Sequence, residues 1–98
     1  MTSKQRAYLK GLAMTMDPIF QIGKSSVTPE LTAAVAEALE ARELIKLSIL
    51  KNCLDDGREI AASLAERTHS EVVQVIGKKI VLYKQAKDEK KRKIELPK

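Results

Sequence analysis

The fold is decided by residues 72–83, which read VVQVIGKKIVLY. Two apolar segments, residues 72–76 and residues 80–83, flank the short turn Gly77-Lys78-Lys79, and both are rich in Val and Ile. Such segments on either side of a short glycine-containing turn are typical of a β-hairpin. The sequence therefore predicts two adjacent antiparallel strands here.

The segment before this hairpin also has a strand pattern. Residues 44–50 alternate in hydropathy, with the apolar side chains of Ile45, Leu47 and Ile49 on one face. Lys46 and Ser48 fall on the other face, and we expect them to line a solvent-facing side of a half-buried strand. A shorter apolar run, residues 19–22, is also rich in strand-forming residues.

Helix signals lie between these strands. Thr28 is a suitable N-cap, and Pro29 suits the first position of a helix. The stripe that this helix would bury consists of Leu31, Ala34, Val35, Ala38 and Leu39. A second helix opens at Asp56, where Glu59 can complete a capping box, and its stripe consists of Ile60, Ala61, Leu64 and Ala65.

The N-terminal segment predicts a further helix over residues 3–16. Thr2 and Gln5 can form a capping box at its start, and Pro18 stops it. The element order is then helix–strand–helix–strand–helix–strand–strand, an α/β fold of the α+β kind. Strands separated by helices favour parallel neighbours, whereas the hairpin is antiparallel, so we expect a four-stranded mixed sheet. The second and third helices should share one face of it.

Charge is unevenly distributed along the chain, whose net charge is +5. Residues 1–24 carry four basic groups against one acidic group, and residues 84–98 carry seven against three. The middle, residues 25–83, carries seven basic against nine acidic groups. This segregation is compatible with a polyanion partner and equally with a solvated surface that has a basic tail. Because the apolar pattern stops at Lys84, we interpret residues 85–98 as a basic, mobile tail outside a single domain of residues 1–84.

The loop Gly23-Lys24-Ser25-Ser26 joins a predicted strand to the capped start of a helix. Free N–H groups and the positive end of the helix dipole make such a position suitable for phosphate. The motif lacks the longer glycine-rich loop of a nucleotide-binding P-loop. Taken alone, it is as expected of an ordinary strand–helix turn.

No catalytic or metal-binding constellation can be assembled from the sequence, which predicts a non-enzyme without cofactor or metal. Cys53 is the only cysteine and His69 the only histidine, and neither has a sequence sign of an activating partner. A single cysteine fits a reducing cytoplasm. No apolar run approaches the ~18–20 residues of a membrane span, so no membrane association is expected.

Five short motifs occur in an order and spacing that resemble a known family. They are Lys4-Gln5-Arg6-x-Tyr8-Leu9, Gln21-Ile22-Gly23-Lys24, Glu43-Leu44-Ile45-Lys46, Val73-Gln74-Val75-Ile76-Gly77-Lys78 and Leu82-Tyr83. Together they resemble the chloroplast RNA splicing and ribosome maturation (CRM) domain, especially its bacterial stand-alone form, the YhbY type. The resemblance covers the chain from Ser3 to Tyr83.

The resemblance implies a fold similar to the C-terminal domain of translation initiation factor three. It also implies an RNA-binding protein that associates with precursor large ribosomal subunits and assists their assembly. One position departs from the family, whose strand–helix loop reads glycine–basic–x–glycine, like the backbone clamp of KH domains. Here Ser26 stands where the second glycine is usual.

The sequence thus predicts a monomeric, cytoplasmic protein whose partner is ribosomal RNA of the large-subunit precursor. The expected RNA-binding residues are Lys4, Arg6, Lys10, Gly23, Lys24, Ser25, Ser26, Lys78 and Lys79. Lys24 and the loop N–H groups would hold phosphate, while the other lysines and the tail add diffuse attraction. The alternative is a protein-interaction adaptor that binds an acidic partner through its sheet or basic tail.

Overall fold

The computed structural model describes all residues, 1–98, and has the predicted order of elements. Three helices, α1 (Ser3–Ala13), α2 (Pro29–Arg42) and α3 (Gly57–Thr68), alternate with strands β1 (Phe20–Ile22), β2 (Leu44–Ile49), β3 (Glu71–Ile76) and β4 (Lys79–Tyr83). A 3₁₀ turn, η1 (Glu89–Lys91), follows near the C-terminus.

The four strands form one mixed sheet in the order β1-β2-β4-β3. β1 runs parallel to β2, whereas β4 is antiparallel to both β2 and β3. The predicted hairpin and the mixed sheet are therefore confirmed. Gly77 in the hairpin turn has φ +55°, a conformation that glycine adopts without strain.

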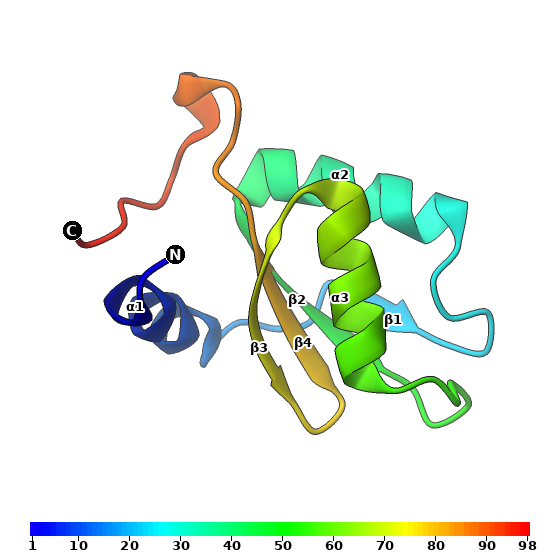
Figure 1. Cartoon of the computed structure of the whole chain (residues 1–98). Helices are drawn as coiled ribbons and strands as arrows, with labels where there is room; N and C mark the ends of the chain where they lie inside the picture. The colour runs from blue at the N-terminus through cyan, green and yellow to red at the C-terminus, as the bar shows by residue number, and fades with distance from the viewer.

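The sheet carries a core on each face. α2 and α3 pack together over one face, where Ile45, Leu47 and Ile49 of β2 point as predicted, and this is the larger core. α1 covers part of the opposite face through Leu9 and Ala13. Figure 1 shows α1 on the other side of the sheet from the α2–α3 pair.

Two helix ends differ from the sequence prediction. The Thr2–Gln5 capping box forms at the start of α1, but the helix ends at Ala13 rather than at residue 16. Lys46 of β2 explains the early end. Its Nζ donates to the carbonyls of Ala13 (3.1 Å) and Met16 (3.2 Å), and these hydrogen bonds satisfy the last carbonyl of the helix and hold the turn that follows it. At the start of α3, the Asp56 side chain makes no capping hydrogen bond, so the predicted capping box is wrong. The carboxylates of Asp56 and Glu59 are exposed, and they stabilise the start of α3 through their charge near the positive end of the helix dipole.

The C-terminal segment also differs from the prediction of a tail separate from the domain. Residues 84–98 fold back over the end of β4, where Ala86 is buried. Ile94 and Leu96 pack against the core under α1, and the Gln5 side chain donates to the carbonyl of Pro97 (3.1 Å). The sequence pattern does not reveal Ala86, Ile94 and Leu96 as buried residues, because the seven residues between Ala86 and Ile94, residues 87–93, are all charged.

Glu43 is the residue that holds this segment. Its side chain is fully buried, and its carboxylate accepts hydrogen bonds from the backbone N–H groups of Ala86 (2.8 Å), Lys93 (2.5 Å) and Ile94 (3.0 Å). Its backbone also accepts from the N–H of Lys84 (2.9 Å). One glutamate thus connects the end of α2 to three points of the C-terminal segment.

Candidate nucleic-acid interface

The loop between β1 and α2 is a closed turn that presents Lys24 to solvent. The N–H of Ser26 donates to the carbonyl of Gly23 (2.9 Å), and both Lys24 and Ser25 are exposed. Thr28 caps α2 by accepting the N–H of Leu31 (3.0 Å). Lys24 therefore stands just before the positively polarised end of a 14-residue helix.

Ser26 has an unusual backbone conformation. Its φ is 54°, in the left-handed region that favours glycine. The serine thus adopts a conformation that glycine adopts without strain, at some cost in backbone energy.

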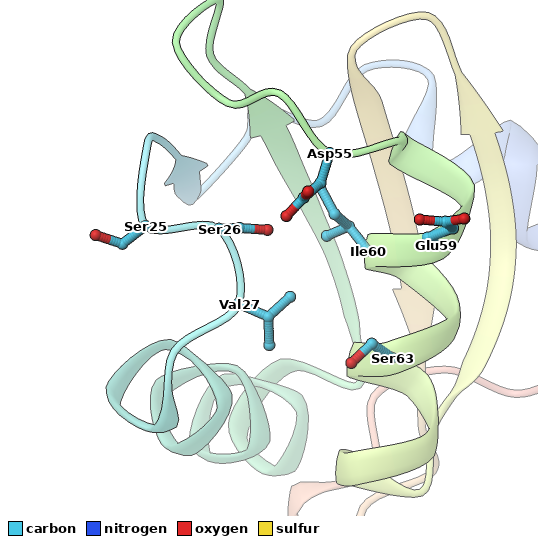
Figure 2. Close-up of a pocket in the computed structure, with 7 residues that line it drawn as sticks. All are labelled: Ser25, Ser26, Val27, Asp55, Glu59, Ile60 and Ser63. Carbon is cyan, nitrogen blue, oxygen red and sulfur yellow. The ribbon is translucent and has the colours of Figure 1, made fainter.

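The two serines of the turn point in different directions (Figure 2). The Ser25 hydroxyl points away from α3, whereas the Ser26 hydroxyl points toward Asp55. Ser26, Asp55 and Glu59 line a cavity of about 340 Å³ between the turn and α3. Because its two carboxylates repel phosphate, this cavity is unsuited to a polyanion, and the exposed Lys24 is the part of the turn that suits one.

The hairpin tip and a third loop lie at the same end of the molecule as this turn (Figure 1). The carbonyl of Lys78 accepts the N–H of Ile49 (2.7 Å), so the tip adjoins the end of β2. A Cβ built at Gly23 would lie 3.5 Å from the Asn52 side chain, so the turn adjoins the loop after β2. That loop adds the exposed Lys51 to this end of the molecule. The sequence alone does not indicate Lys51 as a site residue, because only the folded structure brings its loop next to Gly23.

The basic residues of α1 form a second group on the other side of the sheet. Lys4 and Lys10 are exposed, and Lys4 Nζ donates to the carbonyl of Lys98 (3.3 Å). Arg6 is half-buried, and its guanidinium donates to the carbonyls of Val72 and Val73 at the edge of the sheet. Arg6 therefore fastens α1 to β3, which leaves it less free to meet a ligand than the two lysines.

Two lysines of the sheet join this group. Lys46 and Ser48 were expected to face solvent, but both are half-buried, and Lys46 lies against the end of α1. Lys46 holds the end of α1 as described above, and Ser48 Oγ accepts a hydrogen bond from Lys79 Nζ (3.0 Å). The predicted site residues thus fall into two groups: the loop end, with Lys24 and Lys78, and the α1 side, with Lys4, Lys10 and Lys79.

Charge also differs between the two sides of the sheet. α1 contains three basic residues and no acidic one, whereas α2 contains three glutamates and one arginine. Asp55 and Asp56 add negative charge just before α3. The side that α1 covers is therefore the more suitable one for a polyanion.

The groups with shifted pKa lie elsewhere, around the C-terminal segment. Burial raises the pKa of the Glu43 carboxyl, but the three backbone N–H donors and the charge of Arg92 outweigh it, and the pKa lies below its ordinary value. Two backbone N–H groups, of Lys87 and Asp88, lower the pKa of Glu40. Burial, with the neighbouring Glu43 charge, raises the pKa of Tyr83, whose hydroxyl is buried without a hydrogen-bond partner. These pKa shifts arise where the C-terminal segment is anchored to the domain, and they do not mark a reactive site.

No reactive constellation gathers in the structure. Cys53 is buried in the larger core, and His69 is an exposed residue at the end of α3. No three side chains of the metal-binding types lie close enough to share an ion. None of the helices has the length and apolar character that crossing a bilayer requires.

The fold is that of a small α/β domain with an exposed, lysine-bearing turn between β1 and α2. Residues 1–84 match the CRS1 / YhbY (CRM) domain, and the chain belongs to this family. A relative from Bacillus subtilis (strain 168), named "Probable RNA-binding protein YqeI", is 47% identical over 97 residues, which are 99% of each chain.

Two further proteins support this assignment. A protein of Haemophilus influenzae named "RNA-binding protein" is 31% identical over 97 residues, which cover 99% of this chain and 95% of the relative. The solution structure of the hypothetical protein SAV1595 from Staphylococcus aureus superposes with a TM-score of 0.80 at 47% identity and covers 99% of both chains. The three-helix, four-stranded mixed fold is therefore shared with SAV1595, a protein of known structure.

Proposed function

We propose that this chain is a non-enzymatic RNA-binding protein that associates with precursor large ribosomal subunits in the cytoplasm and assists their assembly. The observation that carries the proposal is the exposed Gly23–Ser26 turn, which holds Lys24 just before the N-terminus of α2. Membership of the CRM family and the names of the relatives support RNA as the partner. Contacts to the sugar–phosphate backbone would make this binding tolerant of sequence.

Replacing Lys24 by alanine tests the turn directly. Each lost phosphate contact flattens the slope of log K against log salt by roughly 0.7 to 0.9. We expect Lys24→Ala to weaken RNA binding and to reduce the slope by about one such contact. Arg67→Ala, which removes an exposed charge near the end of α3, is the control and should change neither quantity as much. An unchanged affinity and slope for Lys24→Ala would show that the loop is only a turn.

Sedimentation of cell extracts tests the ribosomal part of the proposal. The tagged protein should travel with large-subunit precursor particles, and nuclease treatment should release it. Association that survives complete nuclease digestion would instead favour the adaptor that binds an acidic protein. Crosslinking in cells followed by sequencing of the attached RNA would identify the bound site.

A further inference from the structure

α1 leaves part of its side of the sheet uncovered, and a groove of about 510 Å³ remains between the helix and the β3–β4 hairpin. We call this the α1 groove. Ile76 of β3 and Val81 of β4 line it from the sheet, and Met14 lines it from the end of α1. It lies on the opposite side of the sheet from the acidic cavity beside the Gly23–Ser26 turn.

The surface of the α1 groove is unusually apolar for an exposed site. Met14 is 79% exposed and Ile76 is 61% exposed, so two large apolar side chains meet solvent in one place. Small residues of α1 leave room above them, and at Gly11 an added Cβ would meet no atom within 4 Å. Neighbouring exposed apolar side chains around a concave surface mark a ligand site more often than isolated ones do.

Three lysines surround this apolar surface: Lys10 from α1, Lys46 from β2 and Lys79 from β4. Two of the ammonium groups are held in place, because Lys46 Nζ donates to carbonyls at the end of α1 and Lys79 Nζ donates to Ser48 Oγ. No carboxylate lines the groove. The amide of Gln74, which also lines it, can both donate and accept hydrogen bonds.

An apolar surface with a positive rim matches a ligand that is flat and apolar in the middle and anionic at its ends. An unpaired nucleotide within an RNA strand has this chemistry, because its base offers a π-face and its two phosphates offer negative charge. In a duplex both faces of each base are hidden in the stack, so only the lysines could be used.

We propose that the α1 groove binds an unpaired nucleotide of RNA, with the base on Met14 and Ile76 and the flanking phosphates on Lys10 and Lys79. The inference rests on the proposed RNA-binding function and narrows it to RNA that has a single-stranded segment. The Gly23–Ser26 turn, at the loop end of the molecule, would hold a different part of the same RNA.

A tryptophan placed in the groove tests this, since the chain contains none. Ile76→Trp puts the indole at a position that is already exposed, and Ala36→Trp, at an exposed position of α2 outside both the groove and the loop end, is the control. Thermal unfolding of both variants should match that of the unmodified chain. The probes are a single-stranded oligouridine and an RNA duplex with the same number of phosphates.

The oligouridine should quench the fluorescence of Ile76→Trp through base stacking, at least about threefold more strongly than the duplex does at equal bound fraction. The fluorescence of Ala36→Trp should change little with either RNA. Bound fractions come from the anisotropy of labelled RNA. If both RNAs bind but quench the indole at residue 76 equally, or not at all, the groove proposal is overturned while the RNA-binding function stands.

A second pair of variants tests the groove without adding an aromatic ring. Met14→Ser with Ile76→Ser removes the apolar surface and leaves the charge unchanged. It should weaken oligouridine binding by about fivefold, less than the loss of an aromatic stacking partner would cause, and leave duplex binding unchanged. Ala36→Ser, on the exposed face of α2, is the control. Equal losses for both RNAs would overturn the groove proposal, and failure of the unmodified chain to bind any RNA would overturn the proposed function and the groove together.

Discussion

Ser26 is a non-glycine residue at a position whose backbone conformation favours glycine. A non-glycine residue at φ 54° carries strain of the order of 1 kcal/mol, because its Cβ crowds the neighbouring carbonyl oxygen. The turn holds it there through the hydrogen bond from its N–H to the Gly23 carbonyl. Only the backbone angle shows that serine here occupies a position suited to glycine, and the sequence alone does not give that angle.

Restoring glycine at this position should therefore not weaken the fold. We expect Ser26→Gly to leave the free energy of unfolding unchanged or to raise it by up to about 1 kcal/mol, because relief of strain offsets the greater freedom of the unfolded chain. Ser25→Gly is the matched control, since Ser25 is not among the residues with positive φ and should lose about 0.5–1 kcal/mol. Urea unfolding of both variants gives the comparison. RNA affinity of Ser26→Gly should be maintained or increased, and a loss of stability larger than that of Ser25→Gly would contradict this explanation.

Glu43 is the second residue whose role depends on distant parts of the chain. Its folded pKa lies below the ordinary value of 4.5, so its contribution to stability is present above that pH and is lost as pH falls through the folded pKa. Glu43→Gln keeps the shape but places an amide N–H₂ where backbone donors already point. We expect a loss of about 1–3 kcal/mol at pH 7.

The difference in unfolding free energy between the original chain and Glu43→Gln should shrink as the pH is lowered from 7 to 3. Chemical denaturation at several pH values measures it, and comparison of the two proteins removes the effect of the other carboxyl groups. A difference that is independent of pH would mean that the Glu43 charge does not anchor the C-terminal segment.

At the scale of elements, the parts that local pattern determines were predicted well. Thr28 and Pro29 mark the start of α2, the alternation of Ile45, Leu47 and Ile49 gives β2, and the short turn at Gly77 gives the hairpin. Each of these signals involves residues that lie close together in the sequence. The docking of residues 84–98 instead depends on contacts from Glu43 to residues 43 to 51 positions later, and no local pattern reports such a contact.

The candidate site divides in the same way. Lys24 and the turn were identified from local sequence, as were the lysines of α1. Lys51, Met14 and Ile76 were missed, because each gains its importance from a neighbour that only the folded sheet supplies. Arg6 was predicted to meet RNA, but its position against the edge of β3 gives its guanidinium a structural task.

The C-terminal segment yields a prediction at this scale. A mobile tail could be removed without loss of stability, but the structure indicates the reverse. Truncation after Tyr83 would expose that residue, deprive the Glu43 carboxylate of its three donors and remove Ile94 and Leu96 from the core under α1. We expect a loss of about 2–4 kcal/mol in unfolding free energy. Truncation after Leu96, which keeps these contacts, is the control and should be close to neutral. Equal stability of the two truncated chains would restore the interpretation as a mobile tail.

At the scale of the whole molecule, the arrangement of charge matters more than its total. The net charge of +5 is modest for a polyanion binder, yet the lysines of α1 and the glutamates of α2 lie on opposite sides of one sheet. Under the proposed function, such a molecule would present its positive side to RNA and turn its negative side away, which would orient the encounter. Net charge alone does not capture this.

A charge exchange between the two sides tests whether orientation or total charge governs RNA binding. Lys10→Glu and Glu37→Lys change exposed residues of α1 and α2, and together they leave the net charge at +5. If the α1 side binds RNA, the double variant should lose affinity by about tenfold at low salt. This loss combines one lost lysine–phosphate contact with the repulsion between the new glutamate and the phosphate. Glu37→Lys alone should bind at least as well as the original chain. RNA affinity measured at several salt concentrations separates the two explanations, and thermal unfolding checks the fold of each variant. An unchanged affinity of the double variant would mean that the total charge, and not the α1 side, attracts the RNA.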